Sequence, residues 1–107
     1  MSTNPFKKFE LKTKKIKVKE LDNAFVTIQE MTVEKSTDYY KRLFSAKNTN
    51  GEPILNQDEL LNIKFDKISE FMIEPKMTVE ELKALGASAN NAINAINDEI
   101  DALSSGN

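Results

Sequence analysis

The sequence predicts an α+β fold, dominated by helix, in which an N-terminal antiparallel β-hairpin is followed by three to four helices. Two observations carry this prediction: strand-like alternation near residues 14–30, and helical spacing of apolar residues after residue 32. The chain has 107 residues, which suits one domain with a modest core. We expect a single domain over 9–103, between a flexible lead at 1–8 and a tail at 104–107.

The hairpin is predicted over 14–30. Ile16 and Val18 alternate with lysines, which is the period of a half-buried strand. An Asp-Asn pair at 22–23 supplies residues that favour a turn. Residues 25–28 are aromatic or β-branched and predict the second strand. Because an isolated hairpin is only marginally stable in water, it must pack on the rest of the chain.

Start and stop signals divide the remaining chain into helices. Thr32 is a suitable N-cap for the first helix, and a polar run with glycine and proline at 48–53 interrupts the pattern. Thr78 and Glu81 have the spacing of a capping box, and Gly86 ends the short helix that follows. We place the helices at about 33–46, 57–73, 79–85 and 89–103.

The second helix has the clearest signals at its ends. Asn56 and Glu59 have capping-box spacing, and the helix must end before Pro75 because the residue before proline resists helical dihedral angles. Its main apolar stripe consists of Leu60, Leu61, Phe65, Ile68, Phe71 and Met72. Ile63 and Ile73 lie off this stripe, which suggests a second apolar face that could contact a partner.

The last predicted helix carries a narrow apolar line, the isoleucine seam, which consists of Ile93, Ile96, Ile100 and Leu103. Its 3-4-3 spacing is that of a coiled-coil contact, but two heptads are too few for a stable free coiled coil. The seam must therefore dock on this domain, on a second copy or on another protein. Both the core and the intermolecular interpretation stay open, although the narrowness favours a partner.

The composition excludes much catalytic chemistry. The chain has no cysteine, histidine or tryptophan, so it lacks disulfides, a thiolate nucleophile, cysteine zinc sites and a histidine general base. The acidic pairs at 58–59 and 80–81 fall in first helical turns, where carboxylates complement the helix dipole. We therefore expect that the protein is not an enzyme and that it has no catalytic residue, metal site or cofactor.

The charge is uneven along the chain. The net charge is −2, but residues 1–21 carry seven lysines and two glutamates, whereas the remainder carries eight basic and fifteen acidic residues. A basic hairpin can bind phosphates, yet aromatic residues are not interleaved with the lysines as stacking platforms. The pattern thus favours a solvated outer face over nucleic-acid binding. No apolar run exceeds three residues, so we expect neither a membrane span nor a secretory leader.

Several segments taken in order resemble the tail assembly chaperones of long-tailed, siphophage-type bacteriophages. The hairpin KIKVKELDNAFVTI at 15–28 is followed directly by QEMTVE at 29–34. A tyrosine pair at 39–40, the loop NGEPIL at 50–55 and the acidic helix start QDE at 57–59 complete the likeness. It covers about residues 9–73.

The resemblance implies a small non-enzymatic protein of the host cytoplasm that is absent from the mature virion. Such proteins bind the tape measure protein, keep its helices soluble and recruit tail tube subunits, and many are made in two lengths by ribosomal frameshifting. The alternatives are a nucleic-acid-binding phage accessory protein that uses the lysine-rich hairpin, and a structural head–tail adaptor.

A chaperone for helical clients needs apolar grooves, in which a helix docks through i, i+3, i+4 and i+7 anchors. We expect this surface on the last helix and on the second side of helix 57–73, together with methionines near Pro75, because methionine suits adaptable surfaces. Self-association is also expected, since a long client needs several copies. The candidate partner-binding residues are Ile63, Met72, Ile73, Met77, Ile93, Ile96, Ile100 and Leu103.

Overall fold

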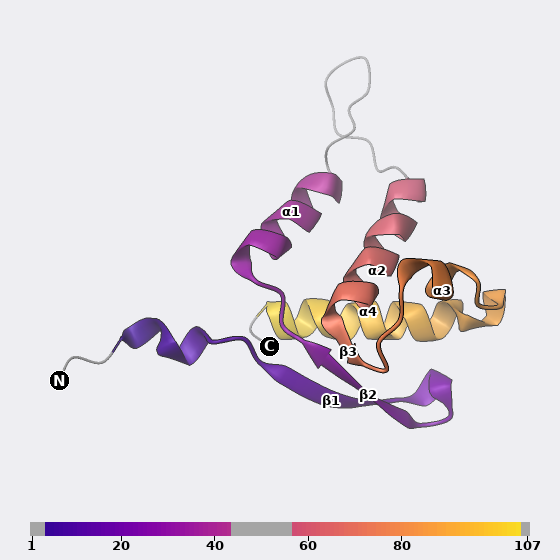
Figure 1. The fold of residues 1–107 in the computed structure, drawn as a ribbon, viewed down its shortest axis with the longest axis horizontal. Helices are drawn as coiled ribbons and strands as arrows, with labels where there is room; N and C mark the ends of the chain where they lie inside the picture. The colour runs from indigo at the N-terminus through magenta and orange to yellow at the C-terminus, as the bar shows by residue number, and fades with distance from the viewer. Residues whose placement is uncertain (1–3, 44–56, 106–107) are drawn as a thin grey trace, which may run out of the picture.

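The computed structural model describes residues 4–43 and 57–105, and it confirms the α+β class, with a sheet early in the chain followed by helices (Figure 1). The strands are β1 (Thr13–Val18), β2 (Ala24–Gln29) and β3 (Met72–Glu74). The helices are α1 (Val33–Leu43), α2 (Gln57–Phe71), α3 (Val79–Lys83) and α4 (Asn90–Ser104). The 3-10 helices are η1 (Pro5–Phe9), η2 (Lys19–Leu21) and η3 (Ala87–Ala89).

The predicted hairpin forms the first two strands of an antiparallel sheet with the order β1-β2-β3. Ile16 pairs with Val26, and both side chains are buried, while the lysines between the apolar residues of β1 are exposed. Asp22 and Asn23 have positive φ angles of 55° and 65°, the left-handed conformation that aspartate and asparagine tolerate best among residues with a side chain. The alternating burial of side chains along β1 and the turn at residues 22–23 therefore agree with the sequence-based prediction.

The third strand was not predicted. The sequence predicted helix to residue 73, but α2 ends at Phe71, and β3 pairs antiparallel with β2, placing Met72 opposite Ile28. Pro75 restrains the residues before it to extended dihedral angles. The exposed edge of β2 then supplies hydrogen-bond partners that a frayed helix end would lack.

The helix boundaries follow their caps. The Lys35 N–H donates to Thr32 Oγ1 at 3.1 Å, and the Thr78–Glu81 capping box forms both of its hydrogen bonds, at 3.0 and 3.1 Å. α3 ends at Lys83 instead of residue 85, because a tighter turn closes it, with the Leu85 N–H donating to the Leu82 carbonyl. The predicted 48–53 loop and the Asn56 cap lie outside the described residues.

Near both ends, the described residues include short structure that the sequence did not predict. Residues 1–8 were expected to be a flexible lead, but Asn4 caps η1 by accepting a hydrogen bond from the Phe6 N–H at 3.0 Å. Ser104 was assigned to the tail, yet it is the last residue of α4, and its hydroxyl accepts a hydrogen bond from the Met31 N–H at 2.9 Å.

The core lies where α4 and α2 pack together against the sheet (Figure 1). Ile28, Ile68 and Ile100 are fully buried there, one from the sheet and one from each helix. Ile93 and Ile96 are also buried, and Leu103 is half-buried against the same core. The isoleucine seam therefore docks on its own domain, and of the two interpretations that the sequence left open, its three isoleucines follow the core one.

Removing the most buried part of this seam should destabilise the whole domain. Ile100→Ala deletes methyl groups at a site with 0% exposure, and we expect the free energy of unfolding to fall by about 2–5 kcal/mol. Urea denaturation followed by circular dichroism measures the change. Asp98→Ala, on the exposed side of the same helix, should shift the midpoint little; equal shifts for the two variants would contradict the core assignment.

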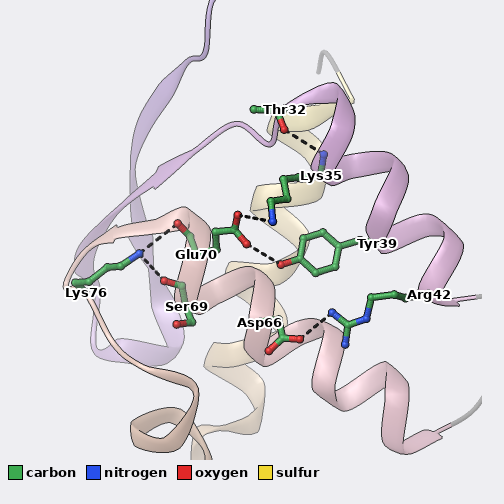
Figure 2. Close-up of polar contacts among 8 residues, drawn as sticks. All are labelled: Thr32, Lys35, Tyr39, Arg42, Asp66, Ser69, Glu70 and Lys76. Atoms are coloured by element: carbon green, nitrogen blue, oxygen red, sulfur yellow. Dashed lines mark hydrogen bonds and ion pairs between the residues drawn. The ribbon is translucent and has the colours of Figure 1, made fainter.

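Polar contacts hold α1 against α2 (Figure 2). The Tyr39 hydroxyl donates to Glu70 Oε2 at 3.1 Å, and Lys35 lies 3.4 Å from the other oxygen of that carboxylate. One turn further along α1, the Arg42 guanidinium donates at 2.8 Å to both Glu59 and Asp66. Burial lowers the pKa of Arg42, but these hydrogen bonds outweigh it, so the pKa is raised and the cation persists.

Tyr39 makes the α1–α2 contact sensitive to alkaline pH. Burial raises the pKa of its hydroxyl above the ordinary 10.0, and the adjacent Glu70 carboxylate raises it further. The folded state therefore holds the proton more tightly than the unfolded state. Stability from this group is complete below pH 10 and is lost as the pH rises above that value.

Tyr39→Phe should show this dependence. The variant loses the hydrogen bond to Glu70, which costs about 1 kcal/mol at neutral pH, and it no longer contributes to the alkaline loss of stability. Denaturation curves at pH 7 and above pH 10 should therefore converge for the two proteins as the pH rises. A constant difference between them would contradict the role assigned to the hydroxyl.

Candidate functional site: an apolar groove beside α3

An apolar groove of about 230 Å³ lies between the β-hairpin, the segment after β3, α3 and α4. Its walls are aliphatic side chains and methionines throughout, and it contains no charged lining residue. Such a lining cannot orient a charged substrate, but it can bury the apolar face of another element. The lining residues are Leu21, Val26, Ile68, Met72, Pro75, Met77, Leu82, Leu85, Ala89, Ala92, Ile93 and Ile96.

The local sequence explains how the groove is held open. Pro75 ends β3 and turns the chain away from the sheet, and the Thr78–Glu81 capping box then starts α3. Leu82 faces the core and is buried, whereas Leu85, three residues later and just past the end of α3, remains 44% exposed. Leu21, near the hairpin tip, also lines the groove and is exposed. Two exposed leucines thus border a buried apolar floor.

The eight predicted partner-binding residues divide between the groove and the rest of the fold. Met72, Met77, Ile93 and Ile96 line the groove, although only Met77 among them is partly exposed. Met72, Ile93 and Ile96 form its floor, where their side chains also complete the core. The structure therefore brings together four of the predicted residues.

The other four lie elsewhere. Ile63 is buried rather than exposed on α2, because α2 is covered on two sides, and it lines a different cleft. Ile100 is fully buried, and Leu103 is half-buried beside it. Ile73 is an exposed residue of β3, outside the groove lining. Ile100 therefore has no exposed surface for a partner, and Ile63 has very little.

Sequence reasoning missed the two rim leucines. Leu85 was treated only as the last residue of a short helix, and Leu21 only as part of the hairpin, just before its turn. A leucine at an exposed turn is ordinary by itself, and only the tertiary fold shows that these two face one floor. The spacing of Leu82 and Leu85, one turn apart before Gly86, was the available signal.

A second cleft, of about 330 Å³, lies among α1, α2 and α4, and polar and apolar side chains both line it. Lys67 is buried there, and its ammonium donates to Asp101 at 2.7 Å and lies 5.9 Å from the Tyr39 ring. The side-chain oxygen of buried Asn97 accepts no hydrogen bond from the described residues. This cleft therefore contains one unused acceptor beside a neutralised cation.

The outer face of the hairpin differs from the sequence-based expectation in one respect. Lys17 pairs across the strands with Phe25, and the Lys15 ammonium lies 5.1 Å from the Phe25 ring. Phe25 is more than half exposed. An aromatic ring thus stands among the lysines, because the antiparallel register places residues from the two strands side by side.

In the part of the chain that the structure describes, no three acidic side chains come close enough to form a metal site. No helix in that part is long and apolar enough to cross a membrane. No protein family, curated protein or solved structure matches the chain. The resemblance to tail assembly chaperones therefore stays a prediction.

Proposed function

We propose that this protein is a non-enzymatic phage tail assembly chaperone that binds helical segments of the tape measure protein and recruits tail tube subunits. The observation that supports this proposal most directly is the apolar groove with its two exposed leucines. A groove of this chemistry suits the apolar face of an amphipathic helix. The protein would act in the host cytoplasm and be absent from the finished virion.

The groove has further features that suit a changing series of client segments. Met77 lines it and is only partly buried, and the flexible thioether side chain adapts to different shapes. The lining carries no charge that would demand a matching charge in the client. Binding would then depend on apolar spacing along the client helix more than on its particular sequence.

Leu85→Asp tests the groove. Peptides that tile the tape measure protein encoded in the same genome provide the probe, and fluorescence anisotropy measures their binding. We expect the best-bound peptide to lose at least about tenfold in affinity, since a charge at the rim must be desolvated when an apolar helix docks.

Leu61→Asp is the matched control, because Leu61 is an exposed leucine of α2 outside the groove, with an exposed fraction of 49% against 44% for Leu85. It should bind the peptides as the unmodified protein does. Equal loss in both variants, or no loss in Leu85→Asp, would overturn the groove as the client site. Absence of binding by every peptide would overturn the chaperone proposal.

A nucleic-acid-binding function is the second candidate, because Phe25 lies among the lysines of the hairpin. A ring between cations is the arrangement that stacks on bases in single-stranded nucleic acid. Our leading proposal predicts no band shift with DNA or RNA at physiological salt. Binding that weakens steeply with salt, and that is lost in Phe25→Ala but kept in Lys83→Gln, would favour this candidate instead.

The head–tail adaptor alternative makes an opposite prediction about the particle. An adaptor stays in the virion, whereas a chaperone leaves it. Mass spectrometry of purified virions separates the two, and stoichiometric presence of this chain would overturn the chaperone proposal.

A further inference from the structure

The two edges of the sheet are protected differently. The strand order is β1-β2-β3, so β1 and β3 are the edge strands (Figure 1). β3 has three residues, a register shift lies beside it, and Pro75 follows it. Short length, irregular pairing and proline all discourage the addition of a further strand. β1 instead has six residues in a regular register and no proline, so only its lysines resist pairing.

The outer edge of β1 presents backbone donors and acceptors. The Glu30 N–H donates to the Lys12 carbonyl at 2.8 Å, so the backbone groups of Lys12 face β2. Because this orientation alternates along an antiparallel ladder, the N–H and C=O groups of Thr13, Lys15 and Lys17 point away from β2. Among the residues that the structure describes, none bonds to these outward groups. Another peptide backbone offers donors and acceptors in the matching alternation, whereas phosphate groups offer acceptors alone.

The unpaired positive charge of β1 lies on one face. Lys15 and Lys17 are exposed, and within the described residues no carboxylate pairs with either. The Lys15 ammonium lies 5.1 Å from the centre of the Phe25 ring, a contact that leaves its charge without a counterion. On the other face, Lys14 lies 3.6 Å from Glu99. Acidic side chains of an added strand are therefore favoured on the face of Lys15 and Lys17.

A hollow of about 300 Å³ lies beside the same edge. Residues of β1, η2 and α4 line it and no residue of β2 or β3 does, so it lies on the free side of β1. Its apolar lining residues are Ile16, Val18 and Ala95, and its charged ones are two lysines and three carboxylates. Since these charges are mixed, the hollow suits small uncharged side chains. The two faces of an added strand thus meet different requirements.

We propose that the outer edge of β1 binds an extended segment of a partner protein, in which acidic side chains alternate with small uncharged ones. The segment would add a fourth strand to the sheet by bonding to the outward backbone groups of Thr13, Lys15 and Lys17. Its acidic side chains would lie beside the lysines, and the uncharged ones would enter the hollow. A second copy fits poorly, because its own β1 would place lysine against lysine. The proposal does not rest on the tail-assembly function, since it uses no residue of the groove.

Hydrogen exchange measured by NMR provides the first test, with a synthetic peptide as long as β1 in which glutamate alternates with valine. At a peptide concentration about ten times the dissociation constant, exchange of the Thr13, Lys15 and Lys17 N–H groups should slow about tenfold. The Lys14 N–H, which faces β2, should change little. A peptide of the same composition with consecutive glutamates is the control and should protect none of them. Binding without protection of the outward groups, or equal protection by the control, would overturn the proposal.

The protein without peptide tests a second copy as the occupant. Exchange of the three outward N–H groups should then be independent of protein concentration. Protection that grows with concentration would assign the edge to a second copy, and the proposal would be wrong.

N-methylated peptides separate backbone pairing from simple charge attraction. In an extended peptide, the N–H groups of the glutamates point to one edge and those of the valines to the other. Methylation of one set should abolish binding and methylation of the other set should leave it, because only one edge faces β1. Equal binding of the two methylated peptides would mean that charge alone holds the peptide, contrary to strand addition.

Charge reversal tests the lysines. Lys15→Glu with Lys17→Glu should weaken binding of the alternating peptide at least about tenfold, because attractive cross-strand pairs become repulsive. Lys41→Glu with Lys83→Glu is the matched control, since it changes the net charge equally at exposed residues of α1 and α3. Its affinity should stay within about twofold, because charges remote from the edge are screened. Circular dichroism checks the fold of both variants.

Equal losses in the two double variants would contradict a site at β1. Single-stranded DNA is the last competitor, and it should not displace the peptide at physiological salt. Displacement would assign this face to nucleic acid and exclude the acidic segment as its occupant.

Discussion

The packing of α4 against the sheet and α2 is the interaction on which the rest of this structure depends. Ile28, Ile68 and Ile100 meet there with no exposed surface. The β-hairpin would be only marginally stable alone, and it is stabilised because α4 packs against it. The five-residue helix α3 packs against α2. The apolar groove exists for the same reason, since its floor is the edge of this contact.

Part of the excess positive charge near the N-terminus is paired with acidic residues of the same molecule. Lys14 on β1 lies 3.6 Å from Glu99 on α4, so the basic hairpin meets an acidic helix of its own chain. Exposed pairs of this kind contribute little to stability. The other lysines near the N-terminus lie on the exposed face of the hairpin and on η1, away from the core.

The sequence by itself determined the class of fold, the hairpin and its turn, and the caps at Thr32 and Thr78, because these depend on residues within a few positions of one another. Tertiary structure alone decided the third strand, since β3 forms only where β2 presents a free edge. It also decided the environment of the isoleucine seam and of Ile63, because periodicity shows which side chains share a face but not what covers that face. The rim leucines belong to the same class: Leu21 and Leu85 are 64 positions apart, and only packing through α4 brings them to one groove.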